Sequence, residues 1–215
     1  MWEWITSGWM SAAIGLVAQN PGWALAVAFL AAIIEALALV GTIIPGTFIV
    51  MGVAGAAAVA GQPMLPFIAV AIAGAVIGDF LSYWIGHHFR FTVRQWWWLA
   101  RRPHLMASAD RFFERYGSYS VALCRFIPVL RSTVPLVAGI AGMKRRQFLV
   151  ANVASALVWA PAHVCPAQLA GLSIDRLREG DWQSAAYLGA GMLACCVAVW
   201  VLHRRLTPLL IAARR

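Results

Sequence analysis

The chain has 215 residues, of which 62% are hydrophobic and only 12% are charged. This balance is too apolar for a soluble globular domain and is typical of a protein that lies largely within the lipid bilayer. The net charge of +9 does not indicate a nucleic-acid partner, because the basic residues stand between apolar runs and form no continuous patch. The four cysteines lie in apolar stretches without metal-ligand spacing, so we expect no disulfide framework, metal site or cofactor.

Most of the chain is expected to be transmembrane helix. Residues 1–20 lack the basic start of a signal peptide, and their tryptophans favour a short helix in the headgroup layer. A helix needs roughly 20 apolar residues to cross the hydrocarbon core. The apolar runs cover about residues 23–60, 65–85, 120–142, 148–172 and 185–202. The second, fourth and fifth runs are therefore predicted to cross the membrane once each, the last over residues 183–203.

The first and third runs do not fit a single crossing. The first run is nearly twice the required length and contains "IIPGTF" near its middle, which fits either a deep re-entrant hairpin or two tilted spans. The third run contains Pro128 and Pro135, which we expect to break the helix. Basic residues flank the third run on both sides, in residues 89–116 and in "KRR" at 144–146. The positive-inside tendency places both flanks in the cytoplasm, so this run is predicted to enter the membrane and return.

The predicted fold is an all-α polytopic membrane protein with two oppositely oriented re-entrant helical hairpins, about three transmembrane helices and an inverted repeat. It forms one membrane domain over residues 1–215, with a core at about 22–172, a cytoplasmic amphipathic segment at 89–116 and a cytoplasmic C-terminus. A weak internal sequence similarity supports the repeat, since "IIPGTFIVMGVAG" and "FIPVLRSTVPLVAG" both place Ile-Pro nine or ten residues before Ala-Gly. Facing hairpin tips imply a polar cavity within the membrane. We expect the tips and the cavity lining to include Pro45, Gly46, Thr47, Pro128, Pro135 and Asn152.

Four charged residues remain inside the apolar runs, namely Glu35, Asp79, Arg125 and Arg131. Each costs about 2.5 to 3.5 kcal/mol at the bilayer centre on insertion scales, so each is a functional candidate. One interpretation is that the arginines bind a phosphate while the acids exchange protons or act as a gate. The alternative is that the four close into salt bridges and leave nothing for a ligand. Asp79 could also simply cap a helix that unwinds after Gly78.

Other polar residues in the apolar runs favour structural roles. His87 and His88 end a predicted span, which favours anchoring at the membrane interface. His163 stands beside two prolines, and a histidine bonded within the bundle is favoured there over a proton relay. Asn152 and Trp159 are expected to pack between helices of the same bundle.

Four stretches of the chain resemble a known family of membrane proteins. These are Glu35 followed by "IIPGTF", then "GAVIGDFLSYWIGHHF", then "FFERYGSYSVALCRFIPVLRSTVPLVAGIAGMKRRQF", and finally "ANVASALVWA". Spanning about residues 29–160, they resemble the DedA family, also called the VTT or SNARE-associated Golgi protein family. The resemblance implies two facing re-entrant hairpins and a role in moving lipids across the bilayer. Bacterial members are linked to the return of undecaprenyl phosphate or phospholipid to the cytoplasmic leaflet, with dependence on the proton gradient.

The resemblance extends to the charged residues. Glu35, Arg125 and Arg131 match the family's intramembrane acid and its two hairpin arginines, and Asp79 matches the acid of its Gly-Asp motif. The chain departs from the acidic type at Thr47, where many members carry a second carboxylate directly after Pro-Gly. Thr47 leaves family membership intact but bears on the proton-coupling scheme.

The expected function is that of a lipid flippase or scramblase and not of an enzyme. It would move an anionic lipid, undecaprenyl phosphate or phospholipid, across the bacterial inner membrane, with coupling to protons. Arg125 and Arg131 are the expected substrate-binding residues, and Glu35 and Asp79 the expected proton-coupling or gating residues. The expected partners are lipids with phosphate headgroups and protons, with a homodimer as the candidate assembly. The alternatives are an intramembrane lipid-phosphate hydrolase and a non-transporting membrane assembly module.

Overall fold

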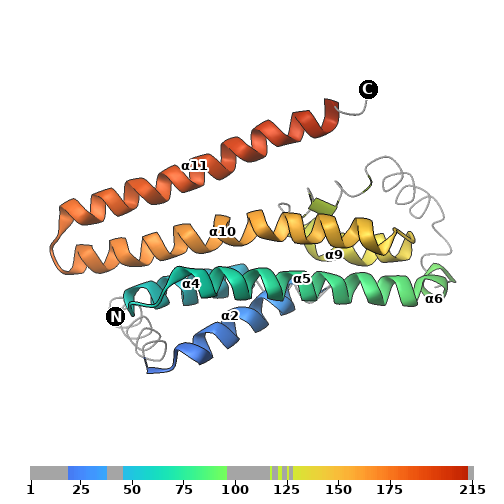
Figure 1. Cartoon of the computed structure of the whole chain (residues 1–215), viewed down its shortest axis with the longest axis horizontal. Coiled ribbons are helices and arrows are strands. Elements are labelled where there is room, and N and C mark those ends of the chain that lie inside the picture. Colours follow the sequence, from blue (N-terminus) through green and yellow to red (C-terminus); the bar gives the residue numbers. More distant parts are fainter. Residues whose placement is uncertain are drawn as a thin grey trace, which may run out of the picture. The chain divides into compact units, whose positions relative to one another are not determined.

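The protein consists of helices joined by short turns in the part of the chain that its computed structural model describes, which comprises residues 19–37, 46–95, 117, 121–122, 125 and 128–212. No strand occurs within these ranges. In chain order the helices labelled in Figure 1 are α2 (Pro21–Ala36), α4 (Gly46–Val59), α5 (Met64–His88), α6 (Arg90–Gln95), α9 (Pro128–Ile140), α10 (Arg145–Arg178) and α11 (Trp182–Ala212). The prediction of an all-α protein is confirmed.

Among the described helices, two are long and apolar enough to cross a membrane. These are α5 and α10, and they match the second and fourth predicted spans, while α2 and α4 are shorter apolar helices. The chain is also helical over residues 183–203, within α11, and the crossing of that segment stays a prediction. Residues 1–18 of the predicted interfacial helix at 1–20 lie outside the described residues, and so does the amphipathic segment at 89–116 apart from α6 and the flanking residue 89.

The two prolines of the third apolar run have different positions in α9. Pro128 is the first residue of the helix, where its missing N–H is not needed. Pro135 lies inside the helix, so the prediction that it breaks the run is wrong. Its ring removes the hydrogen bond that an N–H at this position would donate to the carbonyl of Arg131. Packing outweighs this loss, because the next turn of α9 contributes Ala138, which is fully buried. The return of this run to the face it entered stays a prediction.

The chain forms two compact units. The first comprises residues 1–31, 47–71 and 160–215, and the second comprises residues 32–46 and 72–159. In the second unit, the aromatic ring of Tyr83 on α5 stacks on Phe148 of α10 with ring centroids 4.3 Å apart. The Tyr83 hydroxyl donates a hydrogen bond of 2.6 Å to the carbonyl of Met143 in the turn after α9. These contacts join α5, α9 and α10 around a buried core of Tyr83, Val121, Val134, Ala138, Met143, Phe148 and Ala151.

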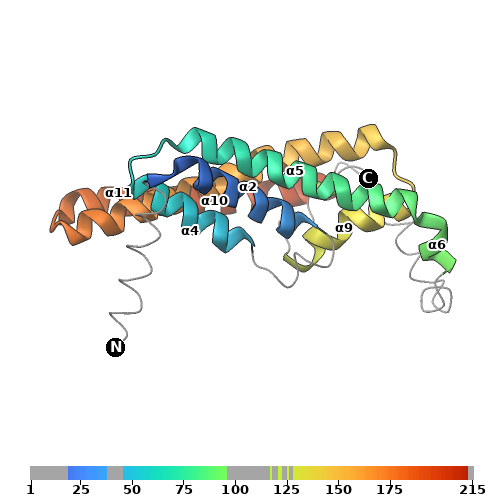
Figure 2. The ribbon, with the colours of Figure 1, turned by 90° about the horizontal axis from the view of Figure 1, so that it is seen from below.

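Glycines allow helices within each unit to approach closely. In the second unit, a Cβ added to Gly139 of α9 would lie 2.2 Å from the carbonyl oxygen of Tyr83 on α5. The two helices lie side by side there (Figure 2). In the first unit, a Cβ added to Gly171 of α10 would lie 2.4 Å from the carbonyl oxygen of Gly55 on α4. Gly55 and Gly139 are the last residues of the two similar stretches of the sequence. The internal similarity therefore coincides with two close backbone crossings. The inverted orientation of the repeat stays a prediction.

We expect Gly139→Ala to lower the free energy of unfolding by roughly 1 to 3 kcal/mol, because the new methyl group overlaps backbone atoms of α5. Gly52→Ala is the matched control, since a Cβ at Gly52 in α4 meets nothing within 4 Å. That control is expected to be neutral or to stabilise the protein by up to about 1 kcal/mol. Thermal unfolding of both variants in detergent measures the difference. Equal unfolding midpoints for the two variants would show that the close approach of α5 and α9 is not required.

Candidate functional site

A close crossing of α2 and α5 brings two acids into one part of the second unit. A Cβ added to Gly78 of α5 would lie 2.7 Å from the Cβ of Ala36 on α2. Ser82, one turn further along α5, donates a hydrogen bond of 3.1 Å to the carbonyl of Ala36. Glu35 precedes Ala36 and Asp79 follows Gly78, so the crossing holds both carboxylates near each other. Each of the two acidic residues is only 6% exposed.

Arg125 is held by α5 and α10 together. Its Nη2 forms an ion pair with the carboxylate of Asp79 and donates a hydrogen bond of 3.0 Å to Oδ1 of Asn152. Its Nη1 donates to the carbonyl of Asn152 and to Oγ of Ser155, each at 2.8 Å. Asn152 in turn donates from Nδ2 to the carbonyl of Val76 on α5, at 3.0 Å. The guanidinium therefore uses two donors on each terminal nitrogen, in a setting closed by two helices.

The structure excludes the interpretation of Asp79 as a helix cap. The helix α5 runs without a break through Gly78 and Asp79 to His88. A capping residue must stand at the end of a helix, where N–H groups have no partner within the helix. Asp79 lies in the helix interior, and its side chain bonds to Arg125 instead.

Arg131 on α9 forms the second buried ion pair. Its Nη1 lies 2.9 Å from Oε1 of Glu35, and the two side chains are 9% and 8% exposed. The guanidinium carbon of Arg131 lies 4.6 Å from the centroid of the Trp159 ring, within the range of a cation–π contact. Trp159 itself is buried. Little of this pair is exposed to solvent, which strengthens the attraction between the charges and makes an unpaired charge costly.

The structure brings together five of the predicted site residues, namely Glu35, Asp79, Arg125, Arg131 and Asn152. The four charged side chains pair as two salt bridges. This is the alternative interpretation of the sequence, in which the four charges leave nothing for a ligand. Sequence reasoning missed the contact from Ser155 and assigned Trp159 to packing alone. Asn152, Ser155 and Trp159 are spaced as i, i+3 and i+7, which places them on one face of α10.

The other predicted site residues are not joined to this cluster by the described contacts. Pro45 lies outside the described residues, and Gly46 and Thr47 begin α4, with Thr47 belonging to the first unit. Pro128 begins α9, and Pro135 is buried inside it. Their role as hairpin tips or cavity lining stays a prediction. Among the described residues, no group of three or more His, Cys, Asp and Glu side chains could hold a metal ion.

The chain is similar to several bacterial membrane proteins. Inner membrane protein YabI of Escherichia coli is 29% identical over 191 residues, which cover 86% of this chain and 72% of the relative. Protein DedA of the same species is 32% identical over 149 residues, 67% of each chain. An uncharacterized membrane protein of Buchnera aphidicola is 27% identical over 204 residues, 94% of this chain and 74% of the relative. No solved structure matches the chain significantly.

The domain family that matches is the VTT domain, over residues 44–169. This range covers more than half of the chain and includes Asp79, Arg125, Arg131 and Asn152, while Glu35 lies just before it. The chain therefore belongs to the DedA family of membrane proteins, which carry the VTT domain.

Proposed function

We propose that this protein is a flippase or scramblase that moves an anionic lipid across the bacterial inner membrane. The observation that carries the proposal is the pair of buried arginines, each held by a carboxylate, inside a membrane protein of this family. Intramembrane charges are costly and are generally retained where they bind or move something charged. The resemblance to lipid-moving members suggests undecaprenyl phosphate or a phospholipid as the substrate.

A lipid phosphate can compete with the carboxylates for the arginines. Phosphate and carboxylate oxygens accept hydrogen bonds from the same edge of a guanidinium, often two at a time. A phosphate that takes this edge displaces the carboxylate into apolar surroundings. Burial without a partner favours the neutral form of a carboxylic acid, so the displaced acid would take up a proton. Phosphate entry and proton uptake are thereby coupled, because the acid that the phosphate displaces accepts the proton.

The two pairs would have different roles in this exchange. Arg125 donates four hydrogen bonds to Asp79, Asn152 and Ser155, so moving it would disrupt contacts with both α5 and α10. Arg131 has one face against Trp159 and directs a donor at Glu35. The stacked ring can keep this guanidinium in place while the acceptor at its edge changes. The pair of Arg131 and Glu35 is therefore the one that opens to a phosphate, with Arg125 as the fixed second charge.

The proposed location is the inner membrane with a cytoplasmic C-terminus. The relative YabI is named an inner membrane protein. Basic residues are concentrated in residues 90–115, in residues 144–146 and at the C-terminal end, and all three groups belong in the cytoplasm by the positive-inside tendency. The turn between α10 and α11 then faces the outer side. The substrate and the proton are the proposed partners, and no covalent step on the lipid is assigned.

In liposomes that contain the purified protein and a fluorescent anionic lipid, Arg131→Gln and Glu35→Gln should each slow translocation by about tenfold or more. The reason is that each variant removes one partner of a charged hydrogen bond that binding must exchange. Arg176→Gln is the control, because Arg176 is exposed and pairs with Glu179 on the protein surface. Wild-type rates in both site variants would refute the assignment of the site.

Arg125 links α5 and α10 through its hydrogen bonds, and this role predicts a large effect of its removal on stability. Arg125→Met leaves the buried carboxylate of Asp79 without its counter-charge and should cost roughly 3 to 5 kcal/mol. The double variant Arg125→Met with Asp79→Leu removes both charges and should recover a substantial part of that loss. Unfolding of the two variants by denaturant titration in micelles makes the comparison. A double variant less stable than Arg125→Met alone would argue against a stabilising ion pair between Arg125 and Asp79.

The closed ion pairs also favour a second candidate, a non-transporting membrane assembly module in which both arginines are structural. The charge-swapped variant Glu35→Arg with Arg131→Glu separates the two functions. For a structural pair the swap should restore both stability and activity relative to each single variant. For a phosphate site it should restore part of the stability while translocation stays low, because the cation no longer lies on α9 beside Trp159. The measurements are unfolding midpoints and lipid translocation on the same samples.

A further inference from the structure

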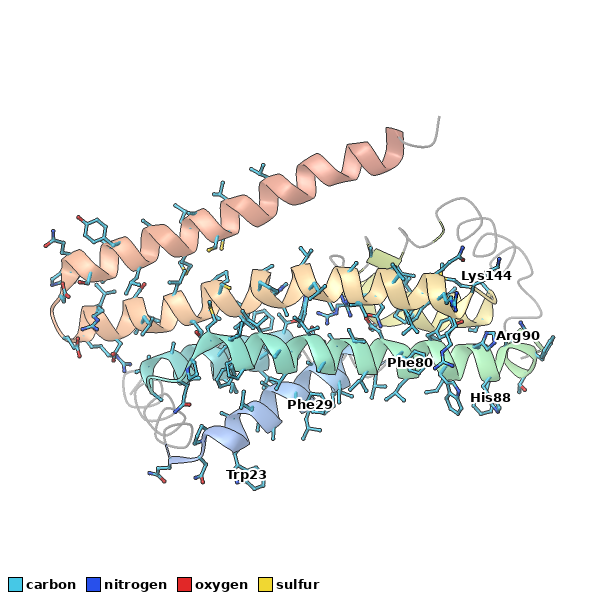
Figure 3. The ribbon with its side chains drawn as sticks, in the orientation of Figure 1. Trp23, Phe29, Phe80, His88, Arg90 and Lys144 are labelled. Atoms are coloured by element: carbon cyan, nitrogen blue, oxygen red, sulfur yellow. The ribbon has the colours of Figure 1, made fainter. Side chains whose placement is uncertain are left out.

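A second polar cluster, of basic side chains, lies in the second unit, apart from the ion-paired site. Six basic side chains gather where α5 ends, where α6 begins and where α10 begins. Figure 3 shows three of them, His88, Arg90 and Lys144, at the same end of the unit. Arg90 is half-buried and the other five are exposed. We call this group the basic collar, and its members are His87, His88, Arg90, Lys144, Arg145 and Arg146.

The fold holds these three segments together. Gly142 in the turn before α10 has φ +75°, a left-handed conformation that favours glycine and reverses the chain after α9. The hydroxyl of Tyr83 binds the carbonyl of Met143 and fixes this turn to α5. A Cβ added to Gly142 would lie 3.3 Å from Nη1 of Arg90, which places α6 beside the same turn. Arg145 stacks over Phe80 of α5 with its guanidinium carbon 5.0 Å from the ring centroid.

The described part of this unit supplies no acid to balance the collar. Its acids are Glu35 and Asp79, and these bind Arg131 and Arg125. The first turn of α10 contains no acid. Three basic residues therefore stand at the positive end of the helix macrodipole, where anions are favoured and cations are not. The stretch from 96 to 116 adds positive charge by sequence, with four arginines against one Asp and one Glu.

The turn between α10 and α11, in the first unit, has the opposite character. Arg176 forms an ion pair of 2.9 Å with Glu179, and Asp175 and Asp181 lie in the same stretch of sequence. Charges in that turn are balanced by the chain itself. Within the described residues, the collar thus lacks the acids that balance the turn between α10 and α11, and an external anion can supply the negative charge.

Exposed aromatic side chains beside the collar indicate what kind of anion this is. Trp84, Phe89 and Phe91 are 51%, 46% and 66% exposed. Aromatic rings next to cationic side chains are typical of the level where lipid headgroups meet the hydrocarbon region. A soluble polyanion would gain little from such apolar surface.

We propose that the basic collar binds the phosphate groups of anionic lipids in the adjoining leaflet. The assignment is independent of the proposed transport site, because it rests on unbalanced charge and exposed aromatic rings. The collar would keep anionic lipid at this end of α5, α6 and α10.

The test counts lipids retained by the full-length protein in native mass spectrometry, after exchange into detergent with equal phosphatidylglycerol and phosphatidylcholine. Wild type should retain phosphatidylglycerol preferentially. The variant Arg90→Gln with Lys144→Gln and Arg146→Gln should lose this preference by at least about tenfold, since each basic residue near a charged surface contributes about fivefold. This variant leaves the stack of Arg145 on Phe80 in place.

Arg176→Gln with Arg178→Gln is the matched control, which removes two basic residues from the balanced turn. The proposal is overturned if wild type shows no preference for phosphatidylglycerol, or if the control loses as much preference as the collar variant. It is also overturned if a moderate excess of inorganic phosphate displaces the retained lipid, because the collar would then be a site for soluble anions. Unchanged thermal unfolding of the collar variant shows that a loss of lipid comes from charge and not from misfolding.

Discussion

A guanidinium can be buried among apolar helices only when acceptors surround it, and the position of Arg125 meets this condition. Two terminal nitrogens donate to a carboxylate, an amide oxygen, a backbone carbonyl and a hydroxyl. Losing any of these acceptors leaves a desolvated donor without a partner. The segment at residue 125, the middle of α5 and the first half of α10 are therefore fixed relative to one another within the second unit. Asn152 reinforces this by bonding to α5 as well.

Small residues make these polar contacts geometrically feasible. The acids lie next to a helix crossing where small residues let the backbones approach: a Cβ added to Gly78 would lie 2.6 Å from the carbonyl oxygen of Ile33 and 2.7 Å from the Cβ of Ala36. Larger residues there would move α2 away from α5 and take Glu35 out of reach of Arg131. Membrane helices gain little from the hydrophobic effect when they associate, so close packing and hydrogen bonds must supply the attraction. The glycines and the ion pairs therefore depend on each other.

The sequence identifies the charged residues of the site but does not reveal their pairing. Glu35 stands out because its neighbours are apolar, and Arg131 because it is a charge within an apolar run, so the pattern alone is enough to select them. Which acid meets which arginine depends on which helices cross, and this is set by contacts far apart in the chain. Pro135 was predicted to break a helix, and tertiary packing outweighs that local preference. Ser155 cannot be identified from the sequence, because a serine in an apolar helix is common. Only its spacing of three residues from Asn152 places it on the face of α10 that contacts Arg125.

The second unit contains charged side chains of two kinds, those paired in the interior and those of the basic collar. Inside, each of the two arginines forms an ion pair with a carboxylate, so the opposite charges cancel in pairs. At the basic collar the described chain offers no acid, so the charge is left to the surroundings. A closed, neutral interior does not attract an anion from a distance, because its fields cancel, whereas an unbalanced exterior does. Under the proposed function, anionic lipid would therefore accumulate first at the collar, and entry to the interior would require an ion pair to open. Separating that pair away from water costs free energy, and this cost limits how often the pair opens. A proton on the displaced carboxylate lowers the cost.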